Sequence, residues 1–212
     1  TADWANIKKC KVILVAVPTP ITKNKTPDTT AIEIATKNIA KYLSNDSLVI
    51  LESTTYPGTT DELVRPLLEK PGRVAGPPAT PRAAWRAGRD FYLAYAPERI
   101  DPGNKDYALT EVPKIVGGID KQSTDLAAIF YLTFLKNVYK VSSPRVAEFT
   151  KLLENIFRLV NVSAINELKL LADKMDIDIW EAIEAAKTKP YGYMPFYPGP
   201  GVGGHCIPVD PF

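Results

Sequence analysis

The sequence predicts an α/β fold in which a doubly wound parallel sheet is followed by a long central helix and a smaller helical region. Short apolar runs alternate with amphipathic segments through the first two thirds of the chain, which is typical of β-α units. Residues 144–174 then contain no proline or glycine after Pro144 itself. The prolines are instead concentrated between the predicted elements and near the C-terminus, as expected for residues that interrupt helices.

Five short runs are expected to form the strands of the sheet. The first, KVILVAV, is continuously apolar, which is typical of a strand buried on both faces. The second, SLVILE, repeats the pattern. The expected strands cover residues 11–17, 47–52, 91–95, 114–116 and 137–141.

Three helices are predicted between these strands. One covers residues 30–43, where apolar residues recur at helical spacing. Thr59 and Glu62 have the spacing of a capping box ahead of a shorter helix, which Pro66 must bend or end. A third, apolar helix covers about residues 120–135.

The segment after the sheet predicts one unusually long helix over residues 144–174. Ser143 is a favourable N-cap, and Pro144 suits the first helical position. A helix of this length runs about 45 Å at about 1.5 Å per residue. Its apolar residues cover more than one stripe, so we expect it to bury surface against a second copy of the chain as well as its own sheet. A homodimer through this helix is therefore predicted.

These elements predict a sheet domain over residues 1–142 and a helical domain over residues 143–212, which includes a second helix at 179–187. Within the first domain, residues 70–89 are rich in proline, alanine, glycine and arginine and contain no acidic residue. We interpret this segment as a mobile surface excursion. A basic interaction loop is the alternative.

Composition disfavours several classes of protein. The chain has 212 residues and a net charge of +2, which is too small to attract nucleic acid or an anionic membrane. No run approaches the roughly 18–20 apolar residues of a membrane helix, and the start shows no secretion signal, so a cytoplasmic protein is expected. Two cysteines and the single histidine, His205, are too few for a usual zinc site, so no metal is expected.

Candidate binding residues follow three of the predicted strands, at the ends where each strand finishes. In open parallel sheets these ends meet at one edge, and ligands bind there. Hydroxyl groups at such positions more often form turns or caps, so each signal is weak by itself. The candidates are Pro18, Thr19, Ser53, Thr54, Glu98 and Arg99.

Cys206 is the candidate nucleophile, although a lone cysteine is more often an inert core thiol. It lies between glycines, with His205 before it and Asp210 four residues after it, in a loop too polar to be core. A reactive thiolate needs an electropositive neighbourhood and a later proton acceptor. Adjacent residues in an extended backbone point apart, which makes a protease-like pair of Cys206 and His205 improbable.

The glycines near Cys206 match the spacing G-x-G-x-x-G at Gly199, Gly201 and Gly204. That spacing indicates a dinucleotide-binding turn only when a strand precedes it and a helix follows it, and neither is predicted here. We therefore interpret these glycines, with Gly203, as a backbone platform that presents Cys206 with little crowding.

Lys151 and Asn155 lie one helical turn apart on the long predicted helix. They belong to a mostly polar stripe that also includes Glu148 and Asn166. One interpretation is a solvated face. The other is an ammonium and an amide held beside a substrate oxygen on which charge develops.

Five motifs, in order along the chain, extend this interpretation. They are V-P-T-P at 17–20, E-S-T-T-Y-P-G-T-T at 52–60, Y-A-P-E-R-I-D-P-G-N at 95–104, F-T-K-L-L-E-N at 149–155 and G-V-G-G-H-C-I-P-V-D-P at 201–211. Together they resemble the nucleotide-sugar 6-dehydrogenases, the UDP-glucose/GDP-mannose dehydrogenase family. The resemblance covers nearly the whole chain except the segment 70–89. The form G-G-H-C-I-P-V-D-P is most similar to the branch that acts on UDP-N-acetylhexosamines.

The resemblance implies a partial Rossmann-like sheet, followed by the central helix and an α-helical dimerisation region, and it implies roles for individual residues. Cys206 matches the nucleophile, Lys151 and Asn155 match groups that stabilise a developing oxyanion, and Asp210 matches a partner in proton handling. Thr54 and Glu98 match positions near the nicotinamide, the sugar and the hydrolytic water. The NAD-binding positions are then Pro18, Thr19, Ser53 and Thr54, and the substrate-binding positions are Glu98, Arg99, Lys151, Asn155, Gly203 and His205.

The chemistry implied by the resemblance is the oxidation of a primary alcohol of a nucleotide sugar to a carboxylate, with two NAD⁺ per turnover. A first oxidation gives an aldehyde, which Cys206 traps as a thiohemiacetal. A second oxidation gives a thioester, which water opens. An ordinary alcohol dehydrogenase stops at the aldehyde and has no use for a thiol.

Two departures from the family pattern leave alternatives open. Family members begin with a strand and a glycine-rich turn and end with a second Rossmann-like domain, so we expect this chain to be a fragment that lacks both. A hydroxyacid-type dehydrogenase shares a Lys/Asn helix but oxidises its substrate once, without need of Cys206. An inactive dimerising fragment is the third possibility.

Overall fold

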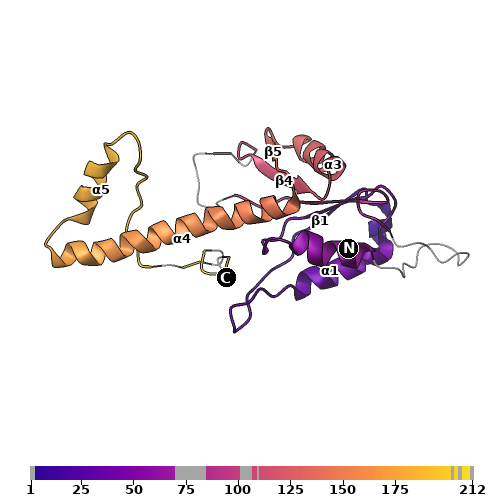
Figure 1. The fold of residues 1–212 in the computed structure, drawn as a ribbon, viewed down its shortest axis with the longest axis horizontal. Helices are drawn as coiled ribbons and strands as arrows, with labels where there is room; N and C mark the ends of the chain where they lie inside the picture. The colour runs from indigo at the N-terminus through magenta and orange to yellow at the C-terminus, as the bar shows by residue number, and fades with distance from the viewer. Residues whose placement is uncertain are drawn as a thin grey trace, which may run out of the picture. The chain divides into compact units, whose positions relative to one another are not determined.

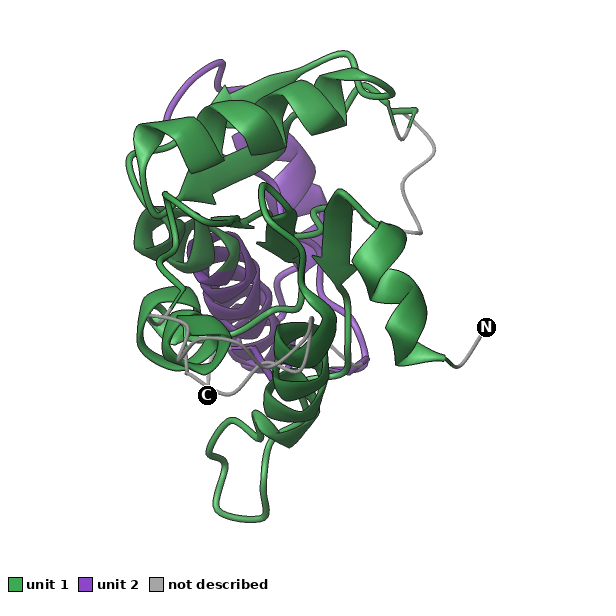
Figure 2. Cartoon of the chain, turned by 90° about the vertical axis from the view of Figure 1, so that its right-hand side faces the viewer, with its two compact units in different colours: residues 1–151 green, residues 152–212 purple. Residues whose placement is uncertain are grey.

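The computed structural model describes residues 3–69, 85–100, 107–108, 110–201, 203–204 and 207–210. The chain divides into two compact units, residues 1–151 and residues 152–212, which Figure 2 colours separately. The junction between them falls inside the long helix. The domain boundary expected between residues 142 and 143 therefore stays a prediction.

Five strands form one sheet in the order of the sequence. The predicted α/β class is confirmed, but the sheet is not parallel throughout, because β3 and β4 are antiparallel while the other neighbours are parallel. The described residues between β3 and β4 include no helix that would return the chain for a parallel strand. The strands are β1 (Val12–Val15), β2 (Leu48–Leu51), β3 (Tyr92–Tyr95), β4 (Lys114–Gly118) and β5 (Val138–Lys140).

Helices cover both faces of this sheet (Figure 1). Val49 and Leu51 of β2 belong to the larger core cluster, with residues of α1 (Thr30–Tyr42) and α2 (Arg65–Glu69). Leu48 and Ile50 belong to a second cluster with α3 (Lys121–Leu132). Successive residues of a strand thus face opposite layers, and both layers are apolar, which explains why the run SLVILE does not alternate in polarity.

The helix expected over 59–68 begins in a wider form. Thr59–Val64 (η2) is a π-helix, and the N–H of Arg65 donates to the carbonyl of Thr60, five residues earlier. Pro66 does not end the helix: the π form changes to the α form at Arg65, immediately before Pro66, and α2 continues to Glu69. Gly58 precedes η2 with a φ of +105°, a conformation that favours glycine.

Part of the segment predicted to be a surface excursion belongs to the folded first unit. Trp85 and Ala87 pack against the larger core cluster, and the rings of Trp85 and Phe91 lie 6.4 Å apart. For residues 85–89 the predicted excursion is therefore wrong. Residues 70–84 lie outside the described part of the chain.

The second unit is built on α4 (Pro144–Lys174) and α5 (Ile179–Lys187), and both helices have the predicted bounds. Asp178 caps α5 by accepting from the N–H of Trp180 at 2.9 Å. The Trp180 ring stacks on Tyr197 at 6.0 Å, so the segment after α5 returns along it (Figure 1). Over the described residues, no helix combines the length and the apolar character needed to span a membrane.

A short 3-10 helix, η1 (Trp4–Lys9), precedes β1. Asp3 caps it by accepting from the N–H of Ala5 at 2.9 Å. Ile7 packs against the larger core cluster, which attaches η1 to the sheet.

Candidate active site

Two loops meet where β1 and β2 end. The Thr19 hydroxyl donates to the carbonyl of Thr54 at 2.6 Å. The Ser53 hydroxyl is buried; it accepts from the N–H of Val17 at 2.8 Å and donates to the carbonyl of Val17 at 2.7 Å. The structure therefore brings three predicted residues together, and Ser53 contributes by joining the loops. Pro18 is exposed beside them.

Glu98 follows β3 and is held in one orientation by the main chain. Its Oε1 accepts from the N–H groups of Arg99 at 2.7 Å and Ile100 at 2.8 Å. Its Oε2 lies 3.4 Å from the Lys114 ammonium. The Arg99 guanidinium turns aside to donate to the carbonyl of Pro113 at 2.6 Å. Of these two predicted residues, only Glu98 faces the charged cluster described next.

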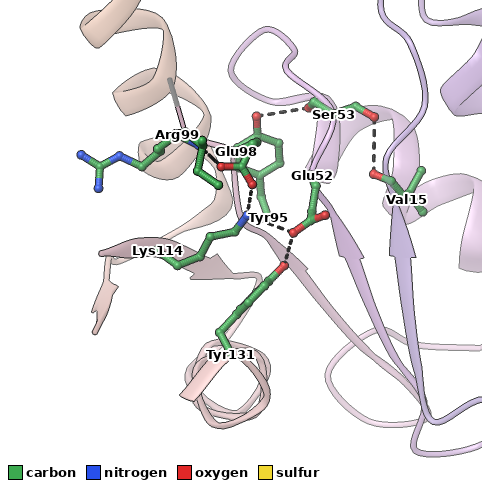
Figure 3. Close-up of polar contacts among 9 residues, drawn as sticks. Val15, Glu52, Ser53, Tyr95, Glu98, Arg99, Lys114 and Tyr131 are labelled. Atoms are coloured by element: carbon green, nitrogen blue, oxygen red, sulfur yellow. Dashed lines mark hydrogen bonds and ion pairs between the residues drawn. The ribbon is translucent and has the colours of Figure 1, made fainter. Parts of the chain in front are cut away.

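A charged cluster lies behind Glu98, and the sequence reasoning missed it (Figure 3). Lys114, at the start of β4, is 7% exposed and forms ion pairs with Glu98 and, at 3.0 Å, with Glu52. The Tyr131 hydroxyl donates to Glu52 at 2.5 Å, and the Lys114 ammonium lies 5.1 Å from the centre of the Tyr131 ring. The sequence contained two signals for this cluster: Lys114 begins one apolar predicted strand, and Glu52 ends another.

The cluster changes the pKa values of two of its groups. Burial opposes ionisation of Glu98, but Lys114 and the N–H groups of Ile100 and Arg99 outweigh it, so the pKa of Glu98 lies below its usual value. Burial raises the pKa of Tyr131 far above its usual value, and the bond to Glu52 adds to the effect. At neutral pH, Tyr131 is therefore a donor and Glu98 is ionised.

Glu52, Glu98, Lys114 and Tyr131 line a cavity of about 440 Å³ in the first unit. Its other walls are mainly apolar, and they include Leu14 of β1 and Phe134 after α3. A charged group at the wall of an apolar cavity is screened less than one in open water, so the interaction of Lys114 with Glu98 is strengthened there.

Glu148 is not part of a solvated face, contrary to one interpretation of the polar stripe. Its carboxylate is fully buried and accepts from the N–H of Gly58, and from the N–H and hydroxyl of Thr60 at 2.9 and 2.7 Å. It occupies the N-terminus of η2, where an anion is favoured. Burial raises the pKa of Glu148 above its usual value, although the three donors oppose the rise.

Lys151 and Asn155 lie on successive turns of α4. Within the second unit, the Asn155 side chain is 5% exposed, and its Nδ2 donates to the Asp210 carboxylate at 2.5 Å. The structure therefore brings together two predicted catalytic residues that are far apart in the sequence. Asn166, farther along the stripe, accepts from the N–H of Gly199 at 2.9 Å and so fixes the approach to the cysteine loop.

The glycine loop has the backbone freedom that the sequence suggested. Gly201 and Gly204 adopt φ values of +117° and +87°, which side-chain-bearing residues rarely adopt. Gly203 is exposed, and a Cβ there would meet nothing within 4 Å. His205 and Cys206 lie outside the described residues, so the roles predicted for them stay predictions.

The loops at the carboxyl edge fit part of a dinucleotide site. Thr19 and Thr54 lie together at the ends of neighbouring parallel strands, which is where such ligands bind. Gly58 lies between β2 and η2, but the Glu148 carboxylate already occupies the N–H groups there. The glycines at 199–204 follow a described segment without a strand, so they lack the surroundings of a pyrophosphate turn.

Comparison with known proteins gives consistent matches over the whole chain. The model of the NAD binding domain of the UDP-glucose/GDP-mannose dehydrogenase family matches residues 1–140, and the model of its central domain matches residues 145–212. UDP-N-acetyl-D-glucosamine 6-dehydrogenase of Pseudomonas aeruginosa is 39% identical over 100% of this chain and 47% of its own length. UDP-N-acetyl-D-mannosamine dehydrogenase of Pyrococcus horikoshii is 38% identical over 98% of this chain and 46% of its own length.

A solved structure gives the same result in three dimensions. A UDP-D-ManNAc dehydrogenase from Pyrococcus horikoshii superposes with a TM-score of 0.85 at 36% identity, covering 99% of this chain and 47% of that one. The chain thus spans about half the length of the relatives it matches. These matches, which extend across both units, show that the chain belongs to the UDP-glucose/GDP-mannose dehydrogenase family.

Proposed function

We propose that this chain is part of an NAD-dependent dehydrogenase that oxidises the 6-hydroxymethyl group of a UDP-sugar, and of a UDP-N-acetylhexosamine in particular, to the carboxylate. The Asn155–Asp210 hydrogen bond carries the proposal, because it joins the helix of the predicted oxyanion residues to the loop of the predicted nucleophile. The relatives reported above are dehydrogenases of UDP-N-acetyl sugars, which supports this substrate class.

NAD, when bound, accepts the two electrons removed at each oxidation. The match of residues 1–140 to the family's NAD binding domain supports this cofactor. Pro18, Thr19 and Thr54 would line its site from the loops after β1 and β2, and Ser53 would keep those loops together through its two bonds to Val17.

The protein's own residues would then perform the acyl chemistry. The Cys206 thiolate adds to the aldehyde and forms a thiohemiacetal, whose oxidation gives a thioester. Lys151 and Asn155 would stabilise the oxygen on which negative charge develops. Water opens the thioester, with Asp210 and Glu98 available as proton acceptors. Gly203, His205 and Arg99 would contact the substrate.

The test follows NADH formation from a panel of nucleotide sugars. It uses the 212-residue chain and a longer version that carries the family's glycine-rich unit before residue 1 and its second Rossmann-like domain after residue 212. We expect two NADH per UDP-N-acetylhexosamine in the longer version. Cys206→Ala should abolish formation of the acid, whereas Cys10→Ala is the matched control and should leave it unchanged.

Two results would favour the alternative functions, a hydroxyacid-type dehydrogenase or a dimerising module. One NADH per substrate, unaffected by Cys206→Ala, would indicate a hydroxyacid-type dehydrogenase. Binding of neither NAD nor any nucleotide sugar by the longer version would leave only a dimerising module.

A homodimer through α4 is the second part of the proposal. Beyond Lys151, the helix exposes large apolar side chains on its surface, including Phe157 at 49%, Val160 at 58% and Leu171 at 52%. Monomeric proteins rarely expose contiguous apolar surface of this kind. Obligate interfaces commonly bury more than about 2,000 Å², and this face of a 31-residue helix offers a continuous strip for one.

Sedimentation at micromolar concentration tests the dimer. Val160→Asp or Ala164→Asp would place an unpaired charge in the proposed interface and should dissociate or unfold the protein. Lys174→Asp, at the exposed end of α4, is the matched control and should do little. A folded monomer for the unmutated chain would overturn the proposed dimer.

A further inference from the structure

Lys114 is a buried cation that no step of the proposed reaction uses. Its side chain is 8% exposed, although lysine is almost never buried unless it is paired. It faces two carboxylates, Glu52 at 3.0 Å and Glu98 at 3.4 Å, of which Glu98 is a predicted catalytic residue (Figure 3). Lys114 is too deeply buried to be an ordinary surface charge, so its position between Glu52 and the predicted catalytic residue Glu98 needs an explanation.

The two oxygens of Glu98 have different surroundings. Oε1 accepts from the N–H groups of Arg99 and Ile100, which use both of its lone-pair positions. Oε2 accepts only from Lys114 among the described residues, at the longer distance of 3.4 Å. A lone pair therefore remains at Oε2, which makes it the oxygen that is able to accept a proton from water or substrate.

The other side of Lys114 is fixed by Glu52 and Tyr131, which have no role in the proposed reaction. Glu52 Oε1 lies 3.0 Å from the ammonium and accepts from the Tyr131 hydroxyl at 2.5 Å. The Tyr131 ring lies under the ammonium at 5.1 Å from its centre, a favourable cation-π distance. Lys114 is thus held by β2 and α3 while it contacts the loop after β3.

We propose that Lys114 is a positioning residue, which holds the Glu98 carboxylate ionised and in one orientation, with Oε2 available as the proton acceptor, while Glu52 and Tyr131 anchor Lys114. The role of Glu98 in the reaction rests on the proposed function; the electrostatic link between Lys114 and Glu98 does not.

Within the described part of the chain, four charged or titratable groups lie around Glu98. Lys114 comes from β4, Glu52 from the end of β2, Tyr131 from α3 and Arg99 from the same loop. Glu52 repels Glu98, and the Arg99 guanidinium is turned toward the carbonyl of Pro113. Of the groups that the structure describes there, Lys114 is the cation that pairs with both Glu52 and Glu98. The direction of the Glu98 pKa agrees, since it lies below the usual value despite burial.

A carboxyl titration by ¹³C NMR on the 212-residue chain tests the link directly, with Glu98 assigned through Glu98→Gln. An opposite charge at this distance shifts a pKa by about one to three units. Lys114→Met should therefore raise the pKa of Glu98 by about one unit or more, and Lys114→Arg, which keeps the charge, should restore most of it. Lys140→Met removes an exposed ion pair with Asp125 and is the matched control.

Lys114→Met leaves Glu52 and Glu98 without the ammonium that pairs with both, so circular dichroism is used to check that this variant folds. The double variant Glu52→Gln with Lys114→Met removes the repulsion as well and keeps the experiment decisive. In it, the pKa of Glu98 should still lie above that of the unmutated chain. An unchanged Glu98 pKa in either folded variant would overturn the proposal.

Turnover in the longer version supplies the second readout. Lys114→Met should lower kcat at neutral pH with KM little changed and move the acid limb of the pH profile upward, and Lys114→Arg should rescue it. Equal effects on KM and kcat, without a shift of the limb, would overturn the positioning role. If the unmutated longer version turns over no nucleotide sugar, the proposed function fails, while the titration still decides whether Lys114 controls Glu98.

Discussion

Two glutamates of the first unit, Glu98 and Glu148, accept similar sets of hydrogen bonds, but their pKa values are shifted in opposite directions. Each accepts from two main-chain N–H groups and from one side chain. The side chain is the Lys114 ammonium for Glu98 and the neutral Thr60 hydroxyl for Glu148. The pKa of Glu98 is lowered and that of Glu148 is raised. Burial is the largest influence on both groups and acts to raise both pKa values. At the half-exposed Glu98 the Lys114 counter-charge and the N–H groups outweigh burial, whereas at the fully buried Glu148 three neutral donors do not.

The difference also separates two uses of a carboxylate. Glu98 is half-exposed, with an oxygen available for chemistry, whereas Glu148 is fully buried and joins α4 to the N-terminus of η2. Because Glu148 is one turn before Lys151, it fixes the start of the helix on which two predicted catalytic residues lie. A second, exposed link joins the same two elements, the ion pair of Arg145 with Glu62.

The largest effect should come from Glu148→Ala. It leaves three buried donors without an acceptor, and each costs about 1–3 kcal/mol, so the free energy of unfolding should fall by roughly 3 kcal/mol or more. Urea denaturation followed by circular dichroism measures this. Glu167→Ala, at an exposed position of the same helix, is the control and should leave the midpoint unchanged. An unchanged midpoint for Glu148→Ala would mean that the hydrogen bonds of Glu148 do not stabilise the fold.

Glu148→Gln should have an intermediate effect, about 1–2 kcal/mol. The amide keeps one oxygen as an acceptor, but its NH₂ group faces an N–H donor of Gly58 or Thr60, so at least one hydrogen bond is lost. The same urea measurement applies. A loss as large as that of Glu148→Ala would mean that the charge itself, and not the acceptors, holds the helix.

The pH dependence of stability should have opposite signs at the two sites. Glu148 has a folded pKa above the unfolded value of about 4.3, so its contribution is greatest below that pH and declines as the pH rises through the folded pKa. Glu98 has a lowered folded pKa, so its contribution is present above about pH 4.3 and is lost as the pH falls through the folded pKa.

Urea midpoints measured from acidic to neutral pH check these signs. In Glu148→Gln, the urea midpoint should fall less than in the unmutated chain as the pH rises toward neutral. In Glu98→Gln, the midpoint should fall less as the pH is lowered. If both variants changed the pH dependence of the midpoint in the same pH range, the two glutamates would not have opposite effects and the comparison would be wrong.

The smallest effect should come from the exposed link. Arg145→Met and Glu62→Gln each break an ion pair whose side chains are about half exposed, and exposed pairs contribute little to stability. The urea midpoint should stay within experimental error of that of the unmutated chain, at low and high salt alike. A clear salt-dependent loss would mean that this pair, and not Glu148 alone, joins α4 to η2.

Local pattern was sufficient for much of the fold. Ser143 and the absence of proline and glycine after Pro144 predict α4, and α5 has the predicted bounds, because capping and helix-breaking residues act within a few residues. The motifs likewise indicated the family and the candidate residues, since each motif lies within one segment of the chain.

Only the tertiary structure decided the direction of β4 and the surroundings of the charged groups. The direction of a strand depends on the connection before it, and no periodicity within residues 114–118 records that. Tyr131 and Glu52 are 79 residues apart, and Glu148 and Gly58 are 90 apart. The sequence by itself determined which residues carry charge and which segments are helical; folding decided which charges are buried together, because burial and pairing depend on neighbours that are distant along the chain.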